Sequence, residues 1–462
     1  MKHWVRNGAY LVLASGVAFA VLFFAISHKP LKRFDAFDQW FYLIAAYDLK
    51  THGVFSNGYF DEVDSTEQVP PPGMFLGPVF PGIIAGAMAV SLRFDQAVSC
   101  AVEARHNKTN IANCDPYATP VHLISCAFLT LGLISIAIAA HVLFLKSSVT
   151  LLTSGLVLSG LLAEAEMFSF IMTEGVTFGL YCLAALFLLR ALKWRGRYDW
   201  LAAGLCVGLL TLTRPSYLLL FPLGVALAVA ASFVCPRRGT LIQTVPIFSL
   251  GFLIIVSPWV LRNYVALGKI GLSEEYGASA LIERFSYNSM TLAEGSASLL
   301  YCVPRLGPSL LKRIPGASRA VSRFEWTNPD GFFAKGKDQR HYLLQQHGRL
   351  DPILYGLVRE EMRANWWRFA LATIPLAWCG LWIGKTWSLL VLPIFAVSVA
   401  TAIQKRVWLF IGYSVPPLMF VFVHGAVANH YTRYNLPLIG PAAIGAAWIL
   451  IGIAKRKIPG VT

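Results

Sequence analysis

The sequence predicts an all-α polytopic membrane protein with about ten transmembrane helices, and three observations lead to this prediction. Of the 462 residues, 56% are hydrophobic and only 14% are charged, whereas soluble domains carry about 25% charged residues. Apolar stretches such as 8–26 and 387–403 reach the roughly 17 to 25 residues that a helix needs to cross a bilayer. The net charge of +15 comes from Lys and Arg in short loops, which is how a membrane protein sets its orientation rather than a sign of nucleic-acid binding.

Basic clusters set the expected topology, because the positive-inside rule places them all in the cytoplasm. They lie at residues 2–6, 146, 190–197, 237–238, 405–406 and 455–457. The spans that satisfy the rule are 8–26, 120–145, 150–166, 170–190, 199–214, 217–234, 242–259, 387–403, 407–427 and 435–454. The first has a longer apolar run than a signal peptide and does not end in small residues, so we expect a retained anchor. Both termini are then cytoplasmic, in a cell (inner or plasma) membrane.

Two further apolar stretches, 75–92 and 366–383, cannot cross the membrane without breaking this charge pattern. The first contains Pro78 and Pro81, and the second begins with Trp366 and Trp367, so we expect extracytoplasmic juxtamembrane helices in the outer interface.

The expected organisation has three parts. Residues 1–261 form a transmembrane module whose first extracytoplasmic loop is 27–119, residues 262–365 form a small extracytoplasmic domain, and residues 366–462 form a C-terminal interfacial helix and transmembrane helices. The pattern of 262–365 predicts no particular fold. Chemistry is expected in the two extracytoplasmic segments.

Six of the eight cysteines fall into two groups. Cys126, Cys182, Cys206 and Cys379 lie in apolar stretches, where a thiol usually acts as a small hydrophobic side chain. Cys100 and Cys114 lie close together in the first extracytoplasmic loop, where a disulfide can persist. We expect this pair to be bridged, and the alternative is two unpaired thiols.

Asp38 is the candidate catalytic residue. Read as a helix, the segment after the first span places Asp38, Tyr42, Ala45 and Ala46 on one face. An acid at the outer membrane surface is suited to take a proton from an attacking hydroxyl. The alternative is that Asp38 only caps the helix.

The chain resembles the GT-C glycosyltransferases, especially the group of protein O-mannosyltransferases and lipid A aminoarabinose transferases. The resemblance rests on motifs in a fixed order. They are Asp38-x-x-x-Tyr42-x-x-x-Ala46, Pro70–Pro72 with Phe80-Pro81, Thr173-Glu174, Thr213-Arg214-Pro215, Pro258-Trp259 with Arg262-Asn263-Tyr264, and Arg433-Tyr434-Asn435-Leu436-Pro437. Each motif is weak alone, but their order over residues 5–450 is fairly specific.

The resemblance implies roles for these residues. The acid of the first loop is the catalytic base in that family, so the role falls on Asp38. Many members have Asp-Glu there, whereas this chain has Gln39, which puts in doubt any role that needs a second adjacent carboxylate. Asp64 and Glu67, in the acidic run 61–67, are the candidate second acids, and the alternative is a solvated acidic loop.

A lipid-phosphate donor requires fixed cations, and the planar fork of arginine suits a phosphate. Arg262, Arg214 and Arg433 lie at the outer ends of spans in this topology, and Arg262 has the strongest motif. The alternative is that these arginines anchor the chain at the interface. Tyr42, Glu174, Asn263 and Tyr264 are candidate supporting residues; an acid such as Glu174 in a span is either structural or faces a cavity.

The predicted function is transfer of a hexosyl or pentosyl group from a polyprenyl-phosphate donor to an extracytoplasmic glycan, lipid or protein, with inversion. No nucleotide loop and no metal-ligand spacing is present in the sequence, so no cofactor is required and nothing supports a divalent metal. The alternatives are a transporter or flippase of lipid-linked sugars, although neither repeated halves nor broken helices are evident, and a scaffold subunit. The sequence identifies neither sugar nor acceptor.

Overall fold

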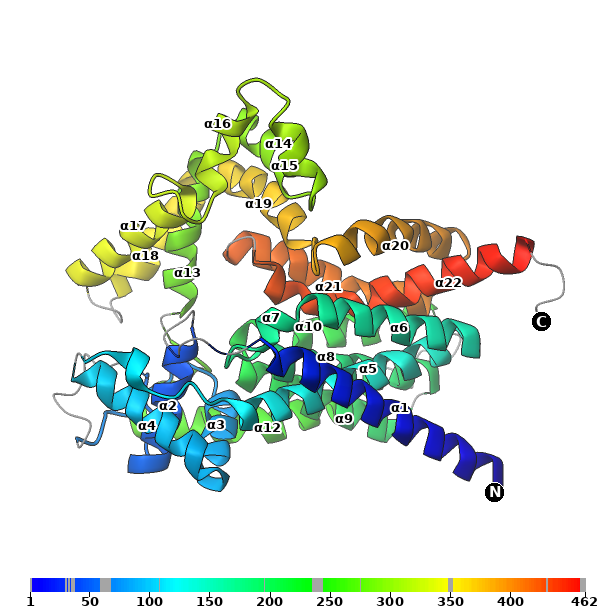
Figure 1. Cartoon of the computed structure of the whole chain (residues 1–462), viewed down its shortest axis with the longest axis horizontal. Coiled ribbons are helices and arrows are strands. Elements are labelled where there is room, and N and C mark those ends of the chain that lie inside the picture. Colours follow the sequence, from blue (N-terminus) through cyan, green and yellow to red (C-terminus); the bar gives the residue numbers. More distant parts are fainter. Residues whose placement is uncertain are drawn as a thin grey trace. The chain divides into compact units, whose positions relative to one another are not determined.

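The structure is a computed structural model that describes residues 2–29, 31, 34, 38–58, 68–107, 109–194, 196–234, 244–274, 276–347, 352–428 and 431–457. These residues form α-helices and short 3-10 helices with no strand (Figure 1), so the all-α prediction is confirmed. The candidate acids Asp64 and Glu67 lie outside the described residues.

The chain divides into two compact units. Unit 1 comprises residues 1–273, 406–413 and 447–462, and unit 2 comprises residues 274–405 and 414–446. Helices α21 (Trp408–Val427) and α22 (Ile439–Lys457) contribute residues to both units.

Unit 1 is built on a bundle of apolar helices. They are α1 (Lys2–Ser27), α5 (Thr119–Phe144), α6 (Ser147–Ala163), the short α7 (Ala165–Phe168), α8 (Glu174–Trp194), α9 (Arg197–Thr213), η2 (Pro215–Leu219), α10 (Leu220–Val234) and α12 (Val245–Leu267). Helix α8 packs along α5 and α9, and α9 packs along α12. Glycines make the last contact close: a Cβ on Gly204 would lie 2.1 Å from the Phe248 carbonyl oxygen. Small residues at helix contacts are typical of membrane bundles.

A smaller group of helices completes unit 1. It contains α2 (Gln39–His52), α3 (Val79–Val90), α4 (Leu92–His106) and η1 (Ile111–Asn113). The chain bends by 120° between α3 and α4, where the Ser91 hydroxyl caps α4 by accepting from the Phe94 N–H. A disulfide joins Cys100 to Cys114, the pair expected from the sequence, with a Cα–Cα distance of 5.8 Å.

Each of the ten predicted spans overlaps a helix. Among the described residues, six helices are long and apolar enough to cross a membrane: Thr119–Phe144, Glu174–Trp194, Val245–Leu267, Thr386–Gln404, Trp408–Val427 and Thr432–Ala454. Shorter apolar helices cover Leu13–Ser27, Ser147–Ala163 and Pro215–Ala230. The chain is therefore a membrane protein, and α12 continues beyond the expected end of its span to Leu267.

Unit 2 begins with a run of short helices in the segment for which the sequence predicted no fold. They are α13 (Tyr276–Phe285), η3 (Ser286–Ser289), α14 (Leu292–Tyr301), α15 (Leu306–Leu311), α16 (Ala317–Val321), η4 (Ser322–Phe324), α17 (Phe332–His347) and α18 (Pro352–Ala364). Helices α19 (Trp366–Gly380) and α20 (Thr386–Gln404) and the 3-10 helix η5 (Thr432–Leu438) follow. One core cluster contains Tyr287, Phe324, Phe332, Ala372 and Leu376, and so joins the short helices to α19.

Arg284 is fully buried inside unit 2. Its guanidinium donates to the Gly425 carbonyl at 3.0 Å, and to the Phe369 carbonyl and the Thr373 hydroxyl at 3.3 Å. Burial lowers the pKa of Arg284 to about 10, so that it stays charged at neutral pH. Arg284 therefore ties α13 to α19 and to the end of α21.

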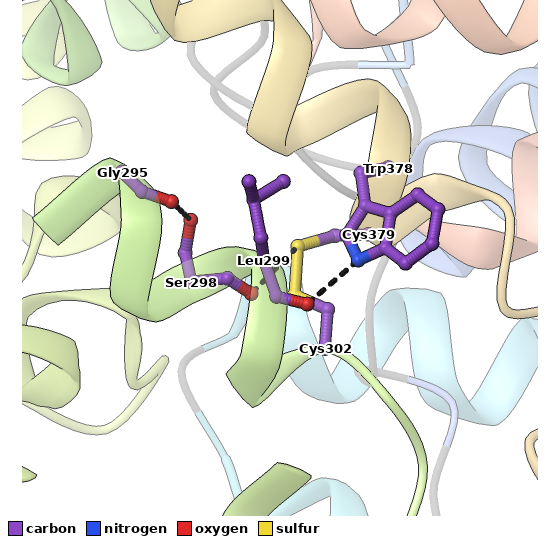
Figure 2. Close-up of a disulfide and its surroundings, with 6 residues drawn as sticks. All are labelled: Gly295, Ser298, Leu299, Cys302, Trp378 and Cys379. Atoms are coloured by element: carbon purple, nitrogen blue, oxygen red, sulfur yellow. Dashed lines mark hydrogen bonds between the residues drawn. A yellow bond between two sulfur atoms is a disulfide. The ribbon is translucent and has the colours of Figure 1, made fainter. Parts of the chain in front are cut away.

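A second disulfide connects Cys302, at the end of α14, to Cys379 in α19 (Figure 2). Next to it, the Trp378 indole N–H donates to the Leu299 carbonyl at 2.7 Å. The sequence prediction for Cys379, a thiol acting as a small hydrophobic side chain, is wrong. Its partner lies 77 residues away in a segment with no predicted fold, so no local pattern pointed to the pair.

Candidate active site

Asp38 lies at the N-cap position of α2 and is partly buried. Its side chain makes no capping hydrogen bond. The geometry therefore does not support the capping alternative, and the carboxylate stands at the start of α2.

Gln39, directly after Asp38, is fully buried. Its side-chain oxygen accepts a hydrogen bond from the Ile171 N–H at 2.8 Å. From α5, the buried His122 places Nε2 2.8 Å from the Ser169 carbonyl oxygen, so this nitrogen donates. Two side chains from different helices thus hold the irregular segment 169–173 against the start of α2.

Glu174 follows this segment and opens α8. Its carboxylate lies 3.7 Å from a guanidinium nitrogen of Arg214, with the two side chains 2% and 15% exposed. Tyr217, also buried, lies one turn beyond Arg214 on η2. The Gln39 bond joins the start of α2 to the residues before Glu174. We call Glu174, Arg214 and Tyr217 the polar cluster of unit 1.

Arg262 makes its contacts with the main chain. Its guanidinium donates to the carbonyls of Gly73 at 2.5 Å and Phe55 at 2.8 Å, and to the Asn263 side-chain oxygen at 3.0 Å. These bonds use three of the five N–H groups of an arginine side chain. Arg262 therefore fastens the Pro-rich loop of the first polar segment to the end of α12.

The Pro-rich loop also reaches the helix end that carries Arg214. A Cβ on Gly77 would lie 2.1 Å from the Leu212 carbonyl oxygen near the end of α9. Residues 73–77 therefore run from Arg262 to the vicinity of Arg214, and only a glycine at position 77 allows this close approach. The same stretch of loop thus bonds to Arg262 and passes close to the backbone that precedes Arg214.

The supporting residues take different positions. The Tyr42 ring packs edge-on against Phe80 at 5.1 Å and so joins α2 to α3. Asn263 is fully buried and donates to the Gly271 carbonyl at 2.9 Å. Tyr264 is 56% exposed. Tyr42 and Asn263 therefore support the loops around the cluster, and Tyr264 lies on the surface.

Arg433 lies in unit 2 and is buried. Its guanidinium carbon lies 4.9 Å from the Tyr431 ring centre and 5.0 Å from the Tyr434 ring centre, close enough for cation–π attraction. Asn435, two residues after Arg433, donates to the Gly380 carbonyl at 2.9 Å and accepts from His424 Nδ1 at 2.8 Å. These bonds fix η5 and with it the position of Arg433.

Within the described part of the chain, no group of three or more His, Cys, Asp or Glu side chains could hold a metal ion. No sequence pattern identified Gln39 as a hydrogen-bond partner or His122 as a residue of this region. A histidine near the start of a predicted span is a signal that could have found it, because polar residues in such spans are rare and usually bonded.

No protein-family profile matches the chain, and no curated protein matches it by sequence. Among solved structures it is similar to the archaeal oligosaccharyltransferase AglB from Archaeoglobus fulgidus, in complex with an inhibitory peptide and a dolichol-phosphate. The TM-score is 0.52 and the identity 12%, over 99% of this chain and 53% of that chain. It is also similar to ArnT from Cupriavidus metallidurans bound to undecaprenyl phosphate, with a TM-score of 0.41 and 14% identity over 97% of this chain and 79% of that chain.

The chain spans about half the length of the oligosaccharyltransferase. Identity at this level is evidence about the fold and not about the reaction. The oligosaccharyltransferase is a GT-C glycosyltransferase, and the match covers nearly all of this chain. The chain therefore has the membrane fold of the GT-C glycosyltransferases, as its sequence predicted.

Proposed function

We propose that the chain is a glycosyltransferase that moves a sugar from a polyprenyl-phosphate donor to an extracytoplasmic acceptor. The observation that carries the proposal is the buried Glu174–Arg214 pair of unit 1, which follows a segment that hydrogen-bonds to the start of the helix whose N-cap position is Asp38, within a GT-C fold. Charged side chains in a membrane bundle are costly and usually functional.

Both disulfides support the proposed topology. Cys100–Cys114 lies in the first polar segment and Cys302–Cys379 joins the second polar segment to α19. Disulfides persist in oxidising compartments and are rare in the cytosol. Both segments are therefore proposed to face the extracytoplasmic side, with the two termini in the cytoplasm.

The proposed reaction is a single displacement with inversion. Asp38 takes the proton from an acceptor hydroxyl or amine as that group attacks the anomeric carbon. A new bond forms from the acceptor oxygen or nitrogen to this carbon, the bond from the carbon to the phosphate oxygen breaks, and its electron pair leaves with the polyprenyl phosphate. Fixed cations stabilise the charge that builds on the leaving oxygen.

Arg214, Arg262 and Arg433 are separate candidates for contact with the donor phosphate. Arg214 lies in the polar cluster, Arg433 is fixed between tyrosine rings, and Arg262 has three N–H groups already bonded to the loop and its own neighbour. Because of these bonds, we rank Arg214 and Arg433 above Arg262, and we propose that Arg262 acts mainly by holding the loop. Glu174 keeps Arg214 in position.

Asp38→Asn tests the proposal. The change preserves size but removes the proton acceptor, so transfer of labelled sugar from polyprenyl phosphate by the purified protein in liposomes should fall about a hundredfold to ten-thousandfold. Asp115→Asn is the matched control, since Asp115 is an exposed acid paired with Arg93 in the same unit, and it should leave the rate unchanged. Normal turnover by Asp38→Asn would exclude Asp38 as the base.

The same liposomes separate the transferase from the transporter. A transferase releases polyprenyl phosphate and requires an acceptor, whereas a flippase moves the intact lipid-linked sugar across the bilayer without releasing it. Release of lipid phosphate only when acceptor is present would support the proposal. Movement of intact donor without release would contradict it.

A further inference from the structure

Three aromatic side chains from separate parts of unit 2 meet at one surface. Trp326 follows η4, Phe333 lies in the first turn of α17, and Tyr431 precedes η5. The Trp326 and Tyr431 rings are stacked with centroids 4.7 Å apart, and Phe333 meets Trp326 edge-on at 4.4 Å. We call these three residues the Trp326 surface.

The Trp326 surface differs from the aromatic core next to it. Phe324 lies two positions before Trp326, and Phe332 lies one position before Phe333. Both are buried in the core cluster, whereas Trp326 is 37% exposed. An exposed tryptophan contributes less to stability than a buried one, because its apolar area stays in contact with solvent. The position of Trp326 is therefore better explained by recognition than by folding.

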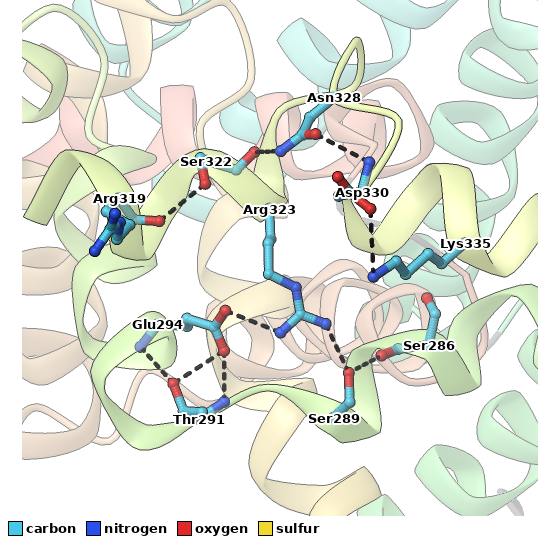
Figure 3. A network of polar contacts seen from close by, with 10 residues as sticks. All are labelled: Ser286, Ser289, Thr291, Glu294, Arg319, Ser322, Arg323, Asn328, Asp330 and Lys335. Atoms are coloured by element: carbon cyan, nitrogen blue, oxygen red, sulfur yellow. Dashed lines mark hydrogen bonds and ion pairs between the residues drawn. The ribbon is translucent and has the colours of Figure 1, made fainter.

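The loop that carries Trp326 is held in place from both sides (Figure 3). Arg323 donates to Glu294 and to the Ser289 hydroxyl, each at 3.0 Å. Asn328 donates to the Ser322 carbonyl at 2.9 Å and accepts from the Asp330 N–H at 3.0 Å. An exposed ring on a loop that is already ordered loses little conformational entropy when it binds a ligand.

Two cations contact the rings, and an exposed ion pair lies close to them in the sequence. The Lys337 ammonium lies 4.3 Å from the Phe333 ring centre, and Arg433 lies 4.9 Å from that of Tyr431. Asp330 and Lys335, 3.7 Å apart, are 84% and 52% exposed. Lys337 thus brings an exposed ammonium to the edge of the rings, and Asp330 is an exposed carboxylate on the loop that follows Trp326.

We propose that the Trp326 surface binds the pyranose ring of a carbohydrate. A sugar presents the complementary pattern, because its ring C–H groups form a flat apolar face and its hydroxyls point outward from the rim. The face would pack on the exposed part of Trp326, and the hydroxyls would bond to Asp330 and Lys337. This inference rests on the proposed function for its biological sense, and the sugar belongs either to the acceptor glycan or to the donor.

Binding measured without catalysis tests the inference. The purified full-length chain is applied to an array of immobilised oligosaccharides built from hexoses, N-acetylhexosamines and pentoses. Trp326→Ala should weaken its best signal about threefold to tenfold, since an aromatic contact contributes about 0.5 to 1.5 kcal/mol. Trp326→Phe keeps a smaller ring, so its array signal should lie between those of the unchanged protein and Trp326→Ala. Trp366→Ala is the matched control, because Trp366 is a 65% exposed tryptophan on α19 of the same unit.

The outcomes separate this inference from the proposed function. The binding defect should be the same when each change is made in the Asp38→Asn background, which has no base. Array signals unchanged by Trp326→Ala, or no signal from any of the three sugar classes, would overturn the inference even if the protein proves to be a transferase. Equal losses in Trp326→Ala and Trp366→Ala would also overturn it, since both changes would then act through the membrane or through folding.

Kinetics then identify the source of the sugar. A Trp326→Ala defect confined to the KM of the acceptor assigns the surface to the acceptor glycan, and a defect confined to the KM of the donor assigns it to the donor sugar. Either result supports carbohydrate binding. A fall in kcat with both KM values unchanged would contradict it.

Discussion

The polar parts of unit 1 and unit 2 each contain a disulfide and ion pairs, but different bonds fix their long loops. In unit 1, Gln39, His122 and Arg262 bond to main-chain groups far away in the sequence. In unit 2, Arg323 pairs with Glu294 and Arg340 with Glu283, and a disulfide closes the segment. Bonds to the main chain define the path of a loop, whereas carboxylates and disulfides respond to acid and to reductant. We therefore expect unit 2 to be the more sensitive of the two to its surroundings.

Removing the disulfide of unit 2 should produce the largest loss of stability. Chain entropy gives about 4 kcal/mol for Cys302–Cys379, whose partners are 77 residues apart, and about 3 kcal/mol for Cys100–Cys114, 14 residues apart. Changing Cys302 and Cys379 to serine should therefore lower the thermal midpoint more than changing Cys100 and Cys114. Hydrogen exchange of α14 and α19 should rise only in the first variant. Equal hydrogen exchange of α14 and α19 in both variants would contradict the expectation that unit 2 depends more on its own disulfide than unit 1 does.

Arg262→Ala should destabilise the loop of unit 1 by about 3 kcal/mol, because it leaves two carbonyl acceptors without a charged donor. Limited proteolysis at residues 53–77 measures this loss directly. Arg262→Lys should be intermediate, since an ammonium cannot reproduce the planar fork.

The matched comparison is Arg433→Lys, which should leave the loop of unit 1 protected and raise the KM for the lipid donor. A donor defect in Arg262→Ala with normal loop protection would instead assign Arg262 to the phosphate. That result would make Arg262 the first of the candidate phosphate-binding arginines again, as its sequence motif predicted.

Acid should loosen the Trp326 loop before it affects the unit 1 loop. Burial raises the pKa of Glu294, but the Thr291 N–H and hydroxyl and the Arg323 guanidinium lower it more, so its pKa lies below the usual 4.5. A lowered carboxylate pKa adds stability that is fully present above pH 4.5 and is lost as the pH falls below 4.5 through the folded-state value. Glu294→Gln should cost about 1 to 2 kcal/mol at neutral pH and flatten this dependence. If the Trp326 loop opens with the same pH dependence in Glu294→Gln as in the unchanged protein, another acid is responsible.

The smallest effect is expected at an ion pair of unit 1. Lys50 lies 2.6 Å from Asp95 and joins α2 to α4, with the two side chains 34% and 19% exposed. Such a pair contributes about 0.5 kcal/mol and is screened by salt. Lys50→Met should therefore shift the thermal midpoint only slightly, and the shift should vanish at high salt. A large, salt-independent shift would mean that unit 1 also depends on charge pairs.

The sequence predicted the parts of the fold that depend on hydropathy. Each predicted span overlaps a helix, because a bilayer demands a long apolar stretch. The short helices of residues 276–347 were not predicted, since their stability comes from a shared core around Tyr287 and Phe332 and not from local periodicity.

The roles of the candidate site residues stay predictions. Asp38, Glu174 and Arg214 stood out as charged residues near the ends of spans; in the structure all three lie in unit 1, where Glu174 pairs with Arg214. The contacts of Gln39 and Arg262 could not be read from the sequence, because their partners are main-chain groups, which carry no residue identity. Cys302–Cys379 was missed for a related reason, since an apolar helix conceals the reactive character of Cys379.

The bonds of Arg262 also have a consequence for biosynthesis. Its partners Gly73 and Phe55 precede it by 189 and 207 residues, and at about 5 to 20 residues per second the ribosome needs roughly 10 to 40 s to cover that distance. During this interval the first loop has already emerged but lacks the side chain that fastens it. Cys100 and Cys114, only 14 residues apart, can close soon after both are made. The first loop is thus cross-linked early in translation and anchored late, so its Pro-rich segment is exposed to chaperones and proteases until the seventh predicted span has been made.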